Sequence, residues 1–534
     1  MSTYFKFVSI IVFALLIVAG RGFGTVCFAN DISLTTPSLV NKNTPTNGEW
    51  DIQFTVSWDN SWCDANASCS GGTQTAAGNW DAAWLFAKFS KWNASSSSWG
   101  AWTHCTLSKT VGDHNAPAGS QVKVGCSSSA SCGGSDTGKG VFIYHNAAGA
   151  FSTAGSNKTN FANVRLRWLY STDGVGASDV VKVKIFGLEM VYIPQGSFYA
   201  GDYATSTASF KAGSADNNPW SITTDDAIYV TATAGGGYYY VSNANGGEDA
   251  TGSVFTIPIA FPKGYNAFYI LKYDVSQGQY RDFLNTLTRT QQTTRAASLT
   301  AAYYSMSGTQ FINYRSVIRN PAIIPGGSTP LTFGVDLDGQ TITSANNNTL
   351  TGDGTFNEAN DGEWVIANYL SWMDVAAFAD WAGLMPFTEL EFEKAARGPQ
   401  LAVAGEYAWG STSITQATAL TNGGQTSETA QAGSNCNYSG AGNVYGPVRV
   451  GTFATAASNT RALSGASYYG VMDFSGGVWK RPVTVGNATG RLFDGLQGDG
   501  VLSANGNATT ANWPGIASGE VIGATGSGFR SGAL

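Results

Sequence analysis

Hydrophobic and polar residues alternate in several segments of the first third of the chain. The pattern is clearest in residues 50–58 (WDIQFTVSW), 83–89, 140–145 and 164–170. Alternation with a period of two predicts β-strands with one buried face, and the Gly, Ser, Asn and Asp clusters between the segments predict turns. Residues 180–186 (VVKVKIF) are expected to form the last of these strands. Several short strands at this spacing predict an all-β sandwich over residues 30–188.

Helical periodicity appears only in the second half of the chain. Apolar residues recur at helical spacing in the stretch that begins at Ser276 and again in residues 371–382. Residues 388–391 (TELE) form a capping-box pattern, which predicts a helix that ends at Arg397. Loops and short apolar runs fill the remainder. Residues 189–534 are therefore expected to form a second domain, of the α+β class and rich in loops.

The first residues have the layout of an export signal. Lys6 precedes an apolar run, residues 7–19, and small residues follow up to Ala29. This order is typical of a secretory signal peptide, so residues 1–29 are expected to be removed. The alternative is an uncleaved anchor, although the run is about five residues short of a comfortable membrane span. The mature protein is therefore predicted to be secreted or exposed at the cell surface, without a transmembrane segment.

Composition narrows the class of protein. Aromatic residues make up 13% of the chain and charged residues only 12%, and the net charge is −7. A disordered chain would have fewer aromatic residues and more charge. Because the basic residues form no stripe, nucleic acid is a poor partner. These values favour a compact protein with a nearly neutral surface.

Cysteine usage agrees with export. Cys27 leaves with the signal peptide, and an even number of cysteines remains, which predicts disulfides in an exported protein. The short spacings 63/69 and 126/132 suit small loops. Of the remaining cysteines, either one from the N-terminal part is bonded to Cys436 or two thiols stay free. Zinc is the remaining alternative, but the sequence has neither a CxxC pair nor paired histidines. The candidate disulfide residues are Cys63, Cys69, Cys105, Cys126, Cys132 and Cys436.

Seven segments of the second half share the order and spacing of motifs in a known family. They are residues 190–198 (MVYIPQGSF), 268–276 (FYILKYDVS), 367–374 (ANYLSWMD), 379–383 (ADWAG), 386–398 (PFTELEFEKAARG), 407–410 (YAWG) and 469–479 (YGVMDFSGGVW). Together they resemble the formylglycine-generating enzyme (sulfatase-modifying factor) family over about residues 190–534. The resemblance implies a C-type-lectin-like fold for this domain, but a fold does not by itself imply a function.

The resemblance implies catalytic groups that the sequence lacks. Active members oxidise a substrate cysteine with copper held by two cysteine thiolates near the C-terminus, a ligand type that Cu(I) favours. After Cys132 this sequence has one cysteine, Cys436, which lies outside that position. Related iron enzymes of the same fold use a histidine cluster, whereas His104, His114 and His145 all lie in the N-terminal domain, where packing roles are expected. The chain is therefore predicted to be a non-catalytic member.

The glycine-rich segment and the C-terminal residues also depart from the family. Gly477, Lys480 and Arg481 stand where the family usually has Asn, Glu and Trp, and that Glu helps to bind Ca²⁺ in the enzymes. Lys480 places a cation there, so this calcium site is expected to be lost. Residues 528–534 match either the final strand, with Ser531 at the catalytic cysteine, or an earlier element. The second interpretation, which we favour, implies that the domain is truncated here and that its cysteine region lies beyond residue 534.

An oxygen-rich loop region is a separate candidate for a Ca²⁺ site. Asp336, Asp338, Asp353 and Asp361 lie among glycine and asparagine residues, and Ca²⁺ prefers such oxygen ligands. The spacing is not that of an EF-hand, and solvated turns are the alternative interpretation. No other cofactor is predicted.

Tryptophans and glycosylation sequons indicate two kinds of surface chemistry. Exposed indoles stack on sugar rings, although large aromatic side chains more often pack in cores. The tryptophans of the N-terminal domain are Trp58, Trp62, Trp80, Trp84, Trp92, Trp99, Trp102 and Trp168. The sequons, which are candidate glycosylation sites in an exported protein, are at Asn66, Asn93, Asn157, Asn347, Asn437, Asn487 and Asn507.

Three functional hypotheses follow. The first is a secreted, non-catalytic surface or structural protein that self-associates into a fibre or layer, or acts as an adhesin. It is favoured by export, low charge and the absent catalytic residues. The second is a carbohydrate- or ligand-binding module, because a lectin-like fold displays variable loops on a rigid frame. The third is a cysteine oxidase of the formylglycine-generating type whose cysteines are missing from this sequence.

Overall fold

A computed structural model provides the structure of the protein. It describes residues 32–43, 48–64, 78–126, 132–150, 159–203, 210–212, 218–242, 248–440, 444–455, 458 and 460–532. The predicted signal peptide, Cys69, Asn66 and Asn157 lie outside these ranges. Within the described ranges, no helix is long and apolar enough to cross a membrane.

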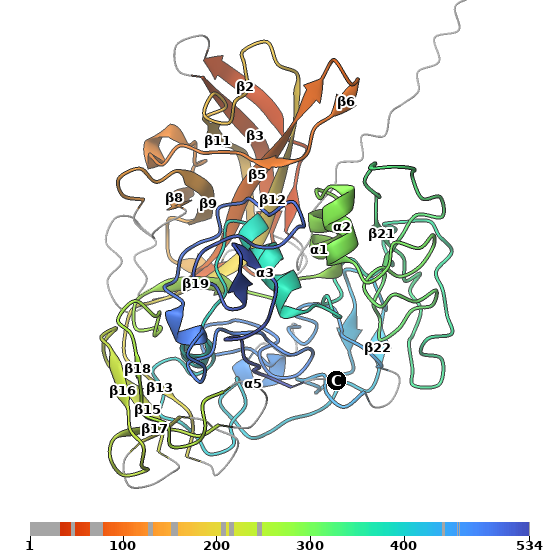
Figure 1. Cartoon of the computed structure of the whole chain (residues 1–534). Coiled ribbons are helices and arrows are strands. Elements are labelled where there is room, and N and C mark those ends of the chain that lie inside the picture. Colours follow the sequence, from red (N-terminus) through yellow and green to blue (C-terminus); the bar gives the residue numbers. More distant parts are fainter. Residues whose placement is uncertain are drawn as a thin grey trace, which may run out of the picture.

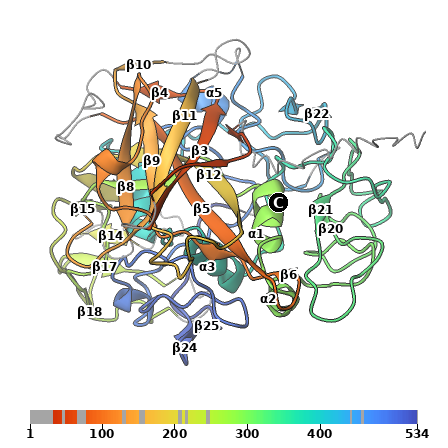
Figure 2. The ribbon, with the colours of Figure 1, turned by 90° about the horizontal axis from the view of Figure 1, so that it is seen from above.

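Two antiparallel sheets contain most strands of the N-terminal part (Figures 1 and 2), and one of them also takes in a strand of the C-terminal half. In the four-stranded sheet, the central strand β3 (Glu49–Trp58) pairs with β1 (Ser33–Leu34), β2 (Ser38–Asn43) and β11 (Thr159–Trp168). The seven-stranded sheet has the order β19 (Phe268–Leu271), β12 (Val181–Ile193), β5 (Asp81–Asn93), β9 (Gly138–His145) and β8 (Ser120–Cys126), and the short strands β6 (Ser98–Trp99) and β7 (Thr103–His104) also pair with β5. Leu107 bridges to Gly138 and to Trp168, which links the two sheets along one edge.

Strand β5 is buried on both faces, because each face packs against a different part of the protein. All ten residues from Asp81 to Ser90 are buried. Successive side chains of a strand point to opposite faces. Phe89 packs on Trp168 of the four-stranded sheet, with ring centroids 5.0 Å apart. On the other face, the Phe86 ring lies 5.0 Å from that of Trp381 in the C-terminal half. The seven-stranded sheet therefore separates two packed layers.

Strand β12 crosses the predicted domain boundary at residue 188. It pairs with β5 over Val181–Val191 and with β19 over Met190–Ile193. The two segments that the sequence predicts as the last strand of one domain and the first strand of the next are thus one continuous strand. Side chains from both halves share a single core cluster.

Five α-helices are described, and their starts follow from capping residues. They are α1 (Gln277–Leu284), α2 (Arg289–Arg295), α3 (Trp372–Trp381), α4 (Glu389–Arg397) and α5 (Arg461–Ser464). Ser276, Ser371 and Thr388 cap α1, α3 and α4 in complete capping boxes, at the positions that the sequence predicts. Helices α1 and α3 lie against the seven-stranded sheet (Figure 2).

Short strands, 3₁₀ turns and loops make up the rest, so the described chain is mostly β with few helices. The remaining elements are β4 (Trp62–Cys63), η1 (Val111–Asp113), β10 (Gly149–Ala150), β13 (Phe198–Ala200), β14 (Phe210–Ala212), β15 (Trp220–Ile222), β16 (Ile228–Val230), β17 (Tyr238–Tyr240), β18 (Phe255–Ile257), β20 (Ile318–Arg319), β21 (Gly334–Val335), β22 (Leu420–Thr421), β23 (Thr429–Ala430), η2 (Gly490–Leu492), β24 (Ile516–Ala517) and β25 (Glu520–Val521).

Candidate functional site

A cavity of about 700 Å³ lies where the seven-stranded sheet meets the loops of the C-terminal half. Trp84 of β5, Phe142 of β9 and Tyr192 of β12 contribute from the sheet. Residues 366–370, 383–387 and 477–481 contribute from the other side, together with side chains of α3. Small-molecule sites commonly measure about 300–1,000 Å³. The cavity is therefore large enough for a small organic ligand, and neither half of the chain builds it alone.

Aromatic rings dominate the lining. Phe142 and Tyr269 stack in parallel with their centroids 3.9 Å apart, and Tyr192 meets Tyr269 edge-on at 5.2 Å. Trp479 and Phe529 line the cavity while remaining exposed, so they lie at its mouth, where their centroids are 5.7 Å apart. Such surfaces favour flat or aliphatic ligands, because aromatic faces bury large apolar areas and stack.

Two tyrosines of the lining have strained backbones. Tyr314 has a φ of 48° and Tyr369 a φ of 59°, in the left-handed region that bulky residues rarely adopt. Stacking on Tyr445, with centroids 4.8 Å apart, helps to hold Tyr314 in place. Strain of this kind costs of order 1–3 kcal/mol per residue and is concentrated at binding sites and active sites. The strained pair therefore favours a functional role for this cavity.

Charged groups occupy several points of the lining. The ammonium of Lys480 lies 2.7 Å from Asp274 Oδ2 and 3.0 Å from the carbonyl oxygen of Val478. The sequence predicts a cation at this position, and the structure places it in an ion pair. Glu391 also lines the cavity, but its carboxylate accepts the backbone N–H of Thr388 at 2.8 Å and completes the cap of α4. Burial raises the pKa of Glu391 to about 7.

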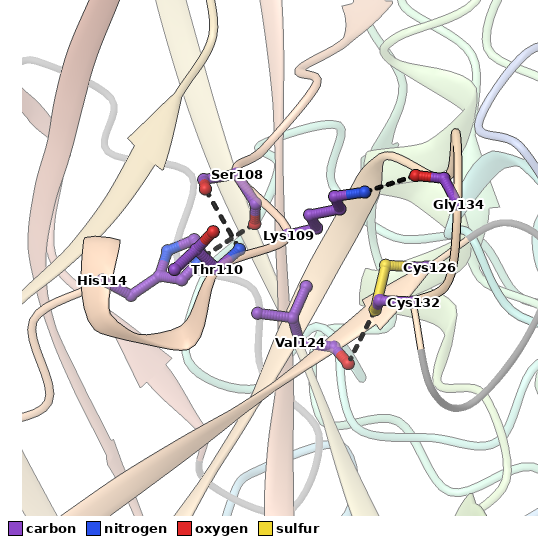
Figure 3. Close-up of a disulfide and its surroundings, with 8 residues drawn as sticks. All are labelled: Ser108, Lys109, Thr110, His114, Val124, Cys126, Cys132 and Gly134. Atoms are coloured by element: carbon purple, nitrogen blue, oxygen red, sulfur yellow. Dashed lines mark hydrogen bonds between the residues drawn. A yellow bond between two sulfur atoms is a disulfide. The ribbon is translucent and has the colours of Figure 1, made fainter.

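The disulfide Cys126–Cys132 borders the cavity through Cys126 (Figure 3). It closes one of the two short loops that the sequence predicts. Cys63 is also disulfide-bonded, whereas Cys69 lies outside the described residues. Cys105 and Cys436 are buried free thiols, so of the two alternatives the structure has the one in which two thiols stay free, and these two residues are not disulfide cysteines.

Neither free thiol is poised for chemistry. Burial raises the pKa of Cys436 to about 12 and that of Cys105 well above its usual value, so both are protonated at neutral pH. Thiols in this state are weak nucleophiles and poor metal ligands. Cys436 donates to the carbonyl of Ser475 at 3.2 Å, and neither thiol lines the cavity.

The three histidines have packing partners, as the sequence predicts. His104 stacks on Phe86 with a centroid distance of 5.7 Å, and its Nε2 lies 2.6 Å from the carbonyl of Lys139. Figure 3 includes His114, whose Nε2 lies 2.9 Å from the carbonyl oxygen of Ser108. His145 contacts the hydroxyl of Thr159 at 3.0 Å. None of the three lines the cavity.

The predicted Ca²⁺ ligands do come together. Asp336, Asp338 and Asp361 offer carboxylate oxygens within 4.8 Å of one another, and Asp338, Asp353 and Glu358 form a second, more exposed group. Asp336 and Asp361 are fully buried. Arg319 pairs with one oxygen of Asp336, and the other oxygen, Oδ1, has no hydrogen-bond partner among the described residues. Burial raises the pKa of Asp361 to about 7, and the two neighbouring aspartates add to the rise.

Addition of Ca²⁺ is expected to raise the melting temperature by roughly 2–5 °C over that in EDTA, because an ion that binds only the folded state stabilises it. Asp361→Asn removes one of the buried carboxylates and is expected to abolish the rise. Asp226→Asn, at an exposed position, serves as the matched control. Equal melting temperatures with Ca²⁺ and with EDTA would leave the aspartates as turn residues. Differential scanning calorimetry measures both.

The tryptophans and sequons divide between core and surface. Trp58, Trp80, Trp84 and Trp168 are buried, whereas Trp99 on the hairpin between β5 and β6 is 40% exposed. Asn93 is exposed, and Asn347 and Asn487 are half-buried. Asn437 and Asn507 are buried, and the amide of Asn507 binds Arg295 and Glu520. Burial of both side chains disfavours a glycan at these two positions, where glycosylation stays a prediction.

Sequence reasoning did not identify the cavity or its strained tyrosines. Tyr314 lies in a loop outside the family motifs, and Tyr369 lies within the motif of residues 367–374, but neither carries a local signal of its left-handed backbone. The departure from the family pattern at Arg481 was visible in the sequence, but only the fold places this residue at the cavity.

The segment with Ser531 lies beside the glycine-rich segment. Lys480 and Arg530 exchange backbone hydrogen bonds of 3.0 Å, and Ser531 donates to the carbonyl of Gly476 at 3.1 Å.

Comparison with protein families bears on the second half of the chain. Residues 182–482, more than half of the sequence, match the model of the sulfatase-modifying factor enzyme 1-like domain. Searches of curated proteins and of solved structures found no match. The matched residues include β12, β19, α1, α3, α4 and the glycine-rich segment, which are the elements that carry the resemblance. The chain therefore belongs to the formylglycine-generating enzyme (sulfatase-modifying factor) family.

Proposed function

We propose that the protein is an exported, non-catalytic member of its family that binds a small organic ligand in the cavity between its two halves. The observation that carries the proposal is the aromatic lining of that cavity, supplied by both halves and bordered by two strained tyrosines. In this proposal the N-terminal sheets form a β-sandwich, the C-terminal half has a C-type-lectin-like frame, and the loops of that frame serve binding.

The chemistry of the lining favours binding over cysteine oxidation. Copper of the family type needs two thiolates. Among the described residues the free thiols are Cys105 and Cys436, which are buried and protonated and do not line the cavity. The cysteine that does border the cavity, Cys126, is held in a disulfide. These features support a binding role for this site.

Surface roles predicted from the sequence are compatible with ligand binding. Self-association into a fibre or layer stays a prediction based on low charge and export. Stacking on glycans stays a prediction for the hairpin between β5 and β6, where Trp92 and Trp99 meet edge-on with centroids 5.3 Å apart. A ligand-binding protein at a cell surface combines the first and second hypotheses from the sequence.

A neutral aromatic probe tests the cavity directly. N-phenyl-1-naphthylamine is expected to bind the full-length protein saturably, at about one probe per chain, with a blue-shifted and enhanced emission, because the aromatic lining excludes water. Ala379→Trp fills space on the cavity-lining face of α3 and should weaken binding at least about tenfold. The control is Ala404→Trp, which makes the same substitution at an exposed loop position. Binding that is absent, or that Ala379→Trp leaves unchanged, would refute the proposal.

A further inference from the structure

Arg481 follows the glycine-rich segment and lines the cavity beside its mouth. Its guanidinium lies 4.0 Å from the ring centroid of Phe529, and its Nη2 donates to the hydroxyl of Ser527 at 3.3 Å. Its Nε is buried and has no hydrogen-bond acceptor among the described residues. Among the described residues Nη2 is the donor of this guanidinium with an acceptor, so the guanidinium retains unused donors in a residue that lines an apolar site.

Arg481 also has no carboxylate partner. Among the described residues it makes no ion pair, in contrast to Lys480, which pairs with Asp274. The pKa of Arg481 is lowered by burial, with no neighbouring acid to oppose the change. Burying a charge without a counter-ion costs free energy, so another interaction must stabilise the guanidinium at this position.

The remaining charges of the lining add to this imbalance. Lys123 of β8 lines the same cavity, and burial lowers its pKa with no acid to compensate. Asp274 is neutralised by Lys480, and Glu391, with a pKa of about 7, is partly protonated at neutral pH. The cavity therefore carries an excess of positive charge within an apolar wall.

We propose that the ligand is a small organic anion with an aromatic or aliphatic body, whose carboxylate, sulfate or similar group binds Arg481. The planar fork of a guanidinium suits oxyanions and forms short charge-assisted hydrogen bonds. The aromatic lining takes the apolar body, and Lys123 contributes positive charge. This inference rests on the proposed function, because it specifies the ligand of the same cavity.

Two probes that differ by one sulfonate group separate the inference from the proposed function. N-phenyl-1-naphthylamine is neutral, and 1-anilinonaphthalene-8-sulfonate adds one sulfonate to the same ring system. The full-length protein is expected to bind the sulfonate at least about tenfold more tightly, the gain typical of a charge-assisted hydrogen bond. Added salt should reduce this advantage, whereas it should leave binding of the neutral probe unchanged.

Arg481→Met keeps an apolar stem against Phe529 and removes the charge. It is expected to weaken binding of the sulfonate by about tenfold and to leave binding of the neutral probe unchanged. Arg289→Met provides the control, because Arg289 bonds to backbone carbonyls outside the cavity. Lys123→Met is expected to cause a smaller loss, for the sulfonate alone.

Each outcome decides a different point. If both probes bind equally to the unmodified protein, the anion inference is overturned and the cavity proposal stands. If Arg481→Met weakens both probes alike, Arg481 acts as a packing residue and the inference is again overturned. If neither probe binds, the proposed function fails first, and the inference fails with it.

Discussion

Replacement of Lys272 by methionine is expected to lower the free energy of unfolding by about 3–5 kcal/mol, the usual cost of removing one partner from a buried ion network. The ammonium of Lys272 lies 3.1 Å from Asp81 Oδ2 and 3.0 Å from Glu189 Oε2, and all three side chains are buried. It also donates to the carbonyl of Asn60 at 3.0 Å. Lys272 follows β19, Asp81 lies in β5 and Glu189 lies in β12. The loss of the Lys272 charge therefore acts on the central strands of the seven-stranded sheet.

Urea unfolding measures this effect, and two further variants separate its causes. Lys91→Met breaks the ion pair with Asp179, in which the lysine side chain is 44% exposed, and should cost less than about 1 kcal/mol. Neutralising the acids in the triple variant Lys272→Met, Asp81→Asn, Glu189→Gln should recover part of the loss, because the buried carboxylates no longer lack a cation. A Lys272→Met variant as stable as Lys91→Met would show that the network contributes little.

Local patterns predicted the long strands β3, β5, β9, β11 and β12 and three of the five described helices. The alternation in residues 50–58 predicted β3 to within one residue, because a strand with one buried face records its environment in every second position. Apolar residues at helical spacing predicted α1 and α3. A capping-box pattern predicted α4, because the N-cap hydrogen bond is local. Helix α2 was missed: its sequence, RTQQTTR, has no apolar face, although Thr288 and Gln291 form a capping box that could have indicated it.

Long-range pairings could not be read from the sequence in the same way. Lys272 is separated from Asp81 by 191 positions, and no local pattern marks them as partners. Residues 83–89 were predicted to have one buried face, and this is wrong because β5 is buried on both faces from Asp81 to Ser90. The sequence does not say that helix α3 covers the second face. The cavity depends on this same placement, since residues of β5, α3 and the glycine-rich segment meet there. In contrast, the candidate Ca²⁺ ligands between Asp336 and Asp361 were predicted because these residues are close in sequence.

Substitution of Trp381 by alanine is expected to destabilise the whole described fold by about 3–5 kcal/mol, as usual for a buried tryptophan. The Trp381 ring lies 5.0 Å from Phe86 and 4.9 Å from Phe186 in the seven-stranded sheet. It also lies 5.3 Å from Phe283 of α1, and its Nε1 donates to Thr286 at 2.8 Å. The substitution leaves a large void where the two halves of the chain pack together, so both halves should lose stability.

Calorimetry with far-ultraviolet and near-ultraviolet circular dichroism tests this coupling. Because one core cluster contains side chains of both halves, the protein and its Trp381→Ala variant should each unfold in a single transition, with coincident midpoints from all probes. Trp99→Ala, at an exposed tryptophan, should change stability by less than about 0.5 kcal/mol. Two separate transitions, of which Trp381→Ala shifts only one, would mean that the sheet and the family domain fold independently. The cavity between them would then form only when the two domains dock, and ligand affinity would depend on that docking equilibrium.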